Sequence, residues 1–177
     1  MACHKQSLAS ARASKDRLGE GVELGFIGYA YHFLGQNKTA IGYYEQALAI
    51  GRQLKILVGV GMVLNELGNA YSALGQYQKA VGYFDEALPI ERRIKNRAVE
   101  GWVLNGLGNA SLHLNQSKKA IDYYEQALAI AREAKDRATE GDTIDNLAHA
   151  YLYLREPDKA ITYGEQALAI AREVKNR

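Results

Sequence analysis

The side chains best suited to metal binding or acid–base catalysis are few, and their spacing does not bring them together. The chain has four histidines, His4, His32, His113 and His149, and one cysteine, Cys3. None of the histidines forms a metal-ligand pair on one helix, and the neighbouring Cys3 and His4 offer two ligands at most. No Gly-x-x-x-x-Gly-Lys-Ser/Thr phosphate loop is present. We therefore expect no catalytic residues, no metal, no cofactor and no enzymatic activity.

Polar side chains that recur at a fixed spacing are more informative. Asn65 and Asn105 are forty residues apart, and so are Asn69 and Asn109. An Asn amide offers both a donor and an acceptor to a peptide backbone, which suits partner recognition. The alternative interpretation is that Asn69 and Asn109 only hold neighbouring helices together.

Arginines recur with the same spacing and would form a stripe. The five are Arg12, Arg52, Arg92, Arg132 and Arg172. Since Arg pairs with carboxylates through two hydrogen bonds, the stripe could bind an acidic peptide. The alternative is pairing between repeats with Glu45, Asp85, Glu125 or Glu165.

The elements that position these residues are copies of one unit. Residues 105–110 and 119–130 resemble residues 65–70 and 79–88, then 145–150 and 159–168, and finally 25–30 and 39–48. The period is forty residues, without insertion or deletion. Self-similarity at a fixed period of this size indicates a repeat array, in which each unit buries its apolar face on its neighbours.

Each copy contains two helical patterns. In the third copy, Leu104, Leu107 and Leu114 recur at helical spacing and define one helix face. We expect first helices at residues 20–34, 58–74, 98–114 and 138–154, and second helices at 2–15, 37–55, 77–95, 117–135 and 157–175.

The turn between the two helices of a copy falls at a residue suited to ending a helix. The four positions are Gly35, Gly75, Asn115 and Arg155. Gly and Asn tolerate the left-handed conformation that terminates helices, whereas Arg155 is strained there. Asp16, Asn96 and Asp136 are expected to cap the first helix of the following copy.

Several residues at repeated positions resemble the signature of the tetratricopeptide repeat. They are Leu67, Gly68, Tyr71, Ala80, Phe84 and Ala87. The forty-residue form, with Leu-Gly-Asn-Ala and the block at residues 129–137, resembles the Pins/LGN adaptors and is similar to bacterial kinesin-light-chain-like tetratricopeptide proteins.

The resemblance implies an all-α, right-handed superhelical solenoid. Residues 1–177 would form a single array, expected to be a segment of a longer one. Its parts would be a partial repeat at 1–19 with a second helix only, followed by repeats at 20–57, 58–97, 98–137 and 138–177.

In such an array the first helices line the concave face. The expected peptide-binding residues are Tyr29, His32, Met62, Asn65, Asn69, Trp102, Asn105, Asn109, His113, Asp142, Asp145, His149 and Tyr153, and the inward positions also include Gly25, Phe33, Ser72, Leu112 and Leu152. No Lys or Arg lies at these positions, so the basic carboxylate clamp of chaperone-binding relatives is absent. The resemblance thus predicts a protein-interaction scaffold that binds a partner peptide or helix.

Two other functions stay open: a regulatory or sensing module of a larger signalling protein, and a self-assembling array. For the latter, the apolar stripe of Tyr163, Ala167, Leu168 and Ile170 would support head-to-tail or tail-to-tail association. A net charge of +2 does not favour nucleic acid, and no apolar run is long enough for a membrane span. The single Cys fits a reducing compartment, so we expect a cytoplasmic protein.

Overall fold

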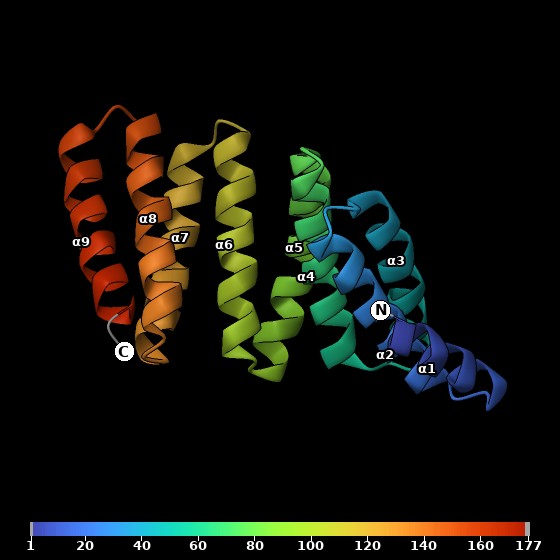
Figure 1. Ribbon diagram of the computed structural model, residues 1–177. Helices are drawn as coiled ribbons and strands as arrows, with labels where there is room; N and C mark the ends of the chain where they lie inside the picture. The colour runs from blue at the N-terminus through green and yellow to red at the C-terminus, as the bar shows by residue number, and fades with distance from the viewer. Residues whose placement is uncertain (1, 176–177) are drawn as a thin grey trace. The chain divides into compact units, whose positions relative to one another are not determined.

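The computed structural model describes residues 2–175 and, in that part of the chain, consists of nine α-helices without a strand (Figure 1). The helices are α1 (Ala2–Ala13), α2 (Arg17–Phe33), α3 (Asn37–Gln53), α4 (Leu57–Ala73), α5 (Tyr77–Ile94), α6 (Arg97–His113), α7 (Ser117–Glu133), α8 (Arg137–Tyr153) and α9 (Pro157–Lys175). The all-α class and the helix-turn-helix organisation are therefore confirmed. The largest difference from the expected ends is at α2, which begins at Arg17 rather than at residue 20.

The helices group into two compact units, residues 1–94 with α1–α5 and residues 95–177 with α6–α9. In unit 1, α2 packs on α3 and α4 packs on α5, while α3 also contacts α4. In unit 2, α6 packs on α7 and α8 on α9, while α7 also contacts α8. First helices also touch directly, α2 with α4 and α6 with α8. The first helices of each unit therefore lie next to each other and can present one shared face.

An aromatic ring of the second helix covers a glycine of the first helix in three of the four repeats. The pairs are Tyr44 with Gly28, Phe84 with Gly68, and Tyr124 with Gly108. All three rings are buried. The fourth repeat reverses the sizes, with Ala148 in the glycine position and Gly164 in the ring position. A glycine in the first helix therefore leaves room for a ring of the second helix.

Helix ends depend on left-handed residues at two places in the repeat. The expected turn positions are confirmed, with φ of 73° at Gly35, 71° at Gly75, and 60° at both Asn115 and Arg155. A second set lies between repeats, where Lys15, Lys55, Lys95 and Lys135 have φ between 54° and 58°. The sequence prediction had made these lysines the last residues of the second helices.

The predicted caps are correct at two of three sites. The Asp16 carboxylate accepts a hydrogen bond from the backbone N–H of Gly19, and Asp136 accepts one from Thr139. Asn96 is the N-cap residue of α6, as expected, but it makes no side-chain bond there, so the predicted capping bond was wrong at that site.

Replacing one left-handed lysine by glycine is expected to stabilise the protein. A residue with a side chain costs about 1–2 kcal/mol in the left-handed conformation, and glycine avoids that cost. Part of this stabilisation is lost because glycine also increases the entropy of the unfolded chain. We expect Lys135→Gly to raise the free energy of unfolding by about 0.5–1 kcal/mol in urea denaturation. Gly35→Ala is the matched control, since its added Cβ would meet nothing within 4 Å. It should lower stability by about 1 kcal/mol, and a loss in both variants would contradict the strain argument.

Candidate functional site

The first helices of unit 1 carry exposed apolar side chains on one face. On α2, Phe26, Tyr29 and Phe33 follow one another at helical spacing, and Phe33 is 82% exposed. On α4, Val58 and Met62 are also about half exposed, at 52% and 48%. Large apolar side chains gathered in this way mark interaction sites on protein surfaces. We call this surface the α2–α4 face.

The same unit has a partly buried carboxyl group on α4, that of Glu66. Asn65 Nδ2 donates a hydrogen bond to Glu66 Oε1 at 3.2 Å, and the Tyr44 hydroxyl lies 3.5 Å from Glu66 Oε2. Burial raises the pKa of Glu66, while His32 and the neighbouring amide donors oppose that rise. Because burial costs the charged form its hydration, a donor or a cation from a partner would be bound favourably here.

The raised pKa makes Glu66→Gln a stabilising substitution at neutral pH. The folded protein keeps the Glu66 proton to a higher pH than the unfolded chain, so stability falls as pH rises through that interval. We expect Glu66→Gln to be more stable than the wild type at pH 7 and equal to it near pH 3, in urea titrations at both values.

Glu140→Gln is the control of opposite sign. Burial alone would raise the pKa of Glu140, but hydrogen bonds from Arg132 and Arg137 hold it below its ordinary value. Glu140 therefore contributes stability that is present at pH 7 and lost on acidification. A loss of stability at pH 7 in both variants would contradict the assignment for Glu66.

The first helices of unit 2 present a second face, the α6–α8 face, with a different composition. Trp102, Leu152 and Tyr153 are 50%, 56% and 62% exposed. Asp145 lies one turn before His149, with Oδ2 3.9 Å from Nε2. The face therefore combines apolar and acidic groups.

The expected binding residues are mostly accessible, but the asparagines have structural partners. Asn65 is only 3% exposed and so is not available to a partner in this structure. Asn105 Nδ2 donates to Thr143 Oγ1 at 3.0 Å and joins α6 to α8. Asn109 Oδ1 accepts from the Tyr124 hydroxyl at 2.7 Å. The helix-holding alternative, which was stated for Asn69 and Asn109, describes the Asn109 contact, because that bond joins α6 to α7.

The remaining expected residues divide between the two units. Unit 1 contains Tyr29, His32, Met62 and Asn69, and unit 2 contains Trp102, His113, Asp142, Asp145, His149 and Tyr153. Sequence reasoning missed Phe26 and Glu66, which share one repeat position. Their spacing of four from Val22 and Met62 is the signal that would have found them.

Three arginines of the stripe form ion pairs between helices. Arg12 Nε donates to Glu20 Oε1 at 2.9 Å, and Arg132 Nε donates to Glu140 Oε1 at 3.0 Å. Arg52 pairs with Glu86. The expected partners Glu45, Asp85, Glu125 and Glu165 were therefore wrong for these three arginines. Arg12 and Arg132 reach the first turn of the next first helix, and Arg52 reaches a neighbouring second helix.

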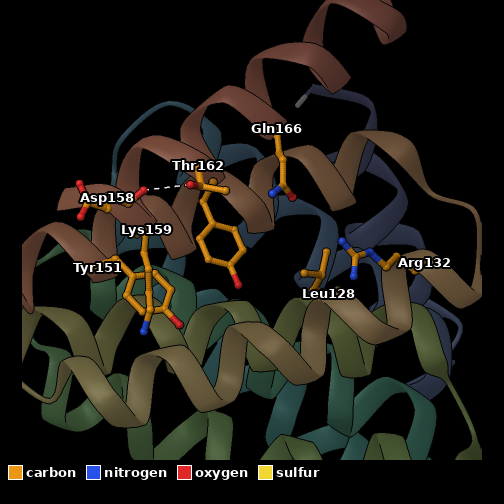
Figure 2. A pocket seen from close by; sticks show the side chains of 8 residues that line it. Leu128, Arg132, Tyr151, Asp158, Lys159, Thr162 and Gln166 are labelled. Carbon is orange, nitrogen blue, oxygen red and sulfur yellow. Dashed lines mark hydrogen bonds between the residues drawn. The ribbon is translucent and has the colours of Figure 1, made fainter. Parts of the chain in front are cut away.

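A cavity of about 440 Å³ lies between α7 and α9, beside the arginine stripe (Figure 2). The rings of Tyr151 and Tyr163 stack there at 5.3 Å, and Lys159 Nζ lies 5.0 Å from the Tyr151 ring centre. Lys159 also pairs with Glu156 at 2.7 Å, and Arg132 is held by Glu140. Since both cations already have carboxylate partners, this cavity is a weaker candidate for acidic ligands.

Residues 2–175 contain neither a grouped metal site nor a membrane-spanning helix. In that range no three His, Cys, Asp or Glu side chains are grouped as a metal site. Likewise, no helix of the described chain is long and apolar enough to cross a membrane.

These features define a helix-pair repeat protein with exposed first-helix faces. The family profile of the tetratricopeptide repeat matches residues 59–133 and 113–173, and a second profile of the same repeat matches residues 23–56. The chain belongs to the tetratricopeptide repeat family. A comparison with curated proteins found no significant match.

Solved structures with the same fold include three informative neighbours. BtubC (BKLC) from P. vanneervenii has a TM-score of 0.89 and 23% identity, covering 99% of this chain and 73% of its own. A Rap protein complexed with Competence and Sporulation Factor has a TM-score of 0.85 and 19% identity, and the match covers 96% of this chain and 47% of the Rap protein. A signal transduction ATPase with a tetratricopeptide repeat sensor from Pyrococcus horikoshii has a TM-score of 0.83 and 24% identity. The match covers 96% of this chain and 26% of the ATPase. The chain thus spans less than half of the last two proteins.

Proposed function

We propose that this protein is an interaction scaffold whose α2–α4 face binds a partner segment with apolar and basic side chains. The observations that carry the proposal are the exposed rings of α2 and, on the adjacent α4, the partly buried Glu66. The rings would bury apolar side chains of the partner, and Glu66 would accept hydrogen bonds from its Lys or Arg. The family supports the general role in protein binding.

The charges of the first helices favour a basic partner. The only Lys or Arg residues on these four helices are Arg17, Arg97 and Arg137, which are the first residues of α2, α6 and α8. Arg17 pairs with Glu20, Arg97 with Glu100, and Arg137 with Glu140. The remaining charged groups include the acids Glu23 and Glu66 in unit 1 and Asp142 and Asp145 in unit 2. An acidic partner would therefore meet like charge.

A sensing role within a larger signalling protein is the second candidate. It is supported by the structural likeness to the ATPase whose tetratricopeptide repeats form its sensor. The same partner-binding face would serve both roles, so the two candidates share the test below. A location in the cytoplasm is part of the proposal.

Selection of binders from a displayed random peptide library tests the proposal directly. We expect the enriched peptides to carry Lys or Arg beside aromatic or aliphatic residues. Tyr29→Ala/Phe33→Ala should weaken their binding by about tenfold or more, because each ring contributes buried area at the contact.

Leu152→Ala/Tyr153→Ala on the α6–α8 face is the matched control, since it removes similarly exposed apolar groups in the other unit. It should leave the affinity of those peptides within about twofold of the wild type. Enrichment of acidic peptides, or equal losses in both double variants, would reject the α2–α4 face as the site.

A further inference from the structure

The turn between α3 and α4 exposes apolar side chains on both sides of a lysine. Residues 54–56 form this turn, and Lys55 at its centre is exposed with a φ of 57°. Leu54 is 39% exposed, and Val58, in the first turn of α4, is 52% exposed. Because the turn is so short, the two apolar side chains lie at the same end of the helices, with the ammonium group of Lys55 between them in the sequence.

The turn between α1 and α2 lies beside it and has a similar composition. Arg17 Nη2 donates to Gln53 Oε1 at 3.3 Å, so the start of α2 meets the end of α3. Leu18 is 53% exposed, and Lys15 is exposed with a φ of 58°. We call the surface of the two turns the basic–apolar edge, which consists of Lys15, Leu18, Leu54, Lys55 and Val58.

The exposure of this edge is a property of the repeat. Ser14 and Ala134, which are exposed, occupy the position of Leu54, and Ala138, also exposed, occupies that of Val58. Val58 is exposed although α1–α3 precede it and α5 follows it, because the turn lies at the ends of the helices and not between them. A further helix pair before or after the described ones would therefore leave the edge open.

The α3–α4 turn lacks acids that the other repeats have. Ile56 and Val60 stand at repeat positions that elsewhere hold acidic residues, namely Asp16, Asp136, Glu20, Glu100 and Glu140. No Asp or Glu occurs between Glu45 and Glu66, whereas Arg52 and Lys55 lie in that stretch. The turn is therefore locally basic in a chain whose net charge is only +2.

The acids of the neighbouring α1–α2 turn are occupied by bonds within the protein. Asp16 caps α2, and Glu20 pairs with two arginines. Neither Lys15 nor Lys55 forms an ion pair within the part of the chain that the structure describes. The two ammonium groups are therefore available to an anionic partner, and the three apolar side chains beside them are available to an apolar one.

We propose that the basic–apolar edge docks on the surface of an anionic lipid bilayer. Leu18, Leu54 and Val58 would enter the interfacial region, and the two lysines would lie among lipid phosphates. Leu54 and Lys55 are adjacent, so a protein partner would need a fixed carboxylate next to an apolar pocket at each turn. Lipid phosphates move laterally and can surround each cation while the acyl region takes the apolar side chains.

This proposal does not rest on the proposed function. Val58 borders the α2–α4 face, whereas the other four residues of the edge lie outside it. A bilayer bound at the edge would leave the rings of α2 to a protein partner, since Phe33 is at the opposite end of that helix.

Unit 2 supplies a matched control at the turn between α7 and α8. Lys135 corresponds to Lys55 and has a φ of 54°. Its neighbours are Ala134, Asp136 and Ala138, so the same backbone conformation here carries small side chains and an acid. We expect this turn not to dock on a bilayer.

Cosedimentation with vesicles tests the proposal. The vesicles are phosphatidylcholine with about 30% phosphatidylserine, and pure phosphatidylcholine is the reference. We expect the full chain to partition at least tenfold more strongly into the anionic vesicles, and less strongly as salt is added. Lys55→Glu and Leu54→Ala/Val58→Ala should each lower that partition about tenfold, whereas Lys135→Glu should stay within about twofold of the wild type. Circular dichroism verifies that the variants remain folded.

A fluorescent label tests insertion. Cys3→Ser/Val58→Cys and Cys3→Ser/Ala138→Cys each carry one cysteine for an environment-sensitive dye. We expect the anionic vesicles to raise the fluorescence of the label at position 58 and to leave that at position 138 unchanged, because only the first enters the interfacial region.

The proposal would be overturned by absent binding to the anionic vesicles, by equal losses in Lys55→Glu and Lys135→Glu, or by unchanged fluorescence at position 58. Binding to soluble polyglutamate but not to vesicles would also overturn it and would assign the edge to an acidic protein. Tyr29→Ala/Phe33→Ala should bind the vesicles as the wild type does, which keeps this test separate from that of the α2–α4 face.

Discussion

Gly108→Ala is expected to lower the free energy of unfolding by about 2 kcal/mol, although alanine is the better helix former. The added Cβ would lie 2.4 Å from Cε1 and 2.6 Å from Cδ1 of the Tyr124 ring. That ring is fully buried and its hydroxyl is bonded to Asn109, so it cannot move aside without disturbing α6 and α7. Urea denaturation followed by circular dichroism measures the loss.

Gly82→Ala is the matched control for this prediction. Gly82 lies inside α5, and a Cβ there would meet nothing within 4 Å. Helix propensity should then act alone and raise stability by about 0.5–1 kcal/mol. If both substitutions changed stability in the same direction, the ring–glycine contact would not be what limits residue size at position 108.

The glycine positions show which features of the core could be predicted from the sequence. The period and the apolar spacing predicted which helices pair, because those patterns repeat without interruption. The forty-residue period also places Gly28, Gly68 and Gly108 at one repeat position. The partner ring could not be assigned, since several aromatic residues recur on each second helix and only helix rotation decides which one lies over the glycine.

The left-handed lysines show a different limit. Lys is a good helix former, and Lys135 continues the polar pattern of the preceding helix. Its conformation is set by the capping bonds around it, in which the N–H of Lys135 bonds to Arg132 O and that of Asp136 to Ala131 O. Such bonds depend on where the next helix starts, which local composition does not indicate.

The candidate site was predictable as a face but not residue by residue. Tyr29 and Met62 lie on the accessible surface, as expected, whereas Asn65 is buried. Asn65 and Glu66 are consecutive residues of α4, so a small rotation of the helix about its axis decides which of the two is buried. The sequence pattern does not define the helix rotation that accurately. The amides of Asn105 and Asn109 also make hydrogen bonds within the fold. The sequence alone cannot distinguish an asparagine with this role from one that binds a partner.

Phe84→Ala is expected to give the largest loss of stability, about 4 kcal/mol. Phe84 is fully buried, and its ring atoms would lie 2.5–2.7 Å from a Cβ at Gly68, so the ring fills the space that the glycine leaves. Removing the ring opens a cavity that Gly68 cannot close, because glycine has no side chain to contribute.

Phe84→Tyr is the control, because it changes the residue at this site but keeps the volume of the ring. In the third repeat the corresponding Tyr124 donates its hydroxyl to Asn109, and the second repeat has Asn69 at that position. The new hydroxyl should therefore find an acceptor, and stability should stay within about 0.5 kcal/mol of the wild type. Urea titrations of the two variants decide the matter: a large loss in Phe84→Tyr, or a loss below about 2 kcal/mol in Phe84→Ala, would show that the ring is not the main filling of this site.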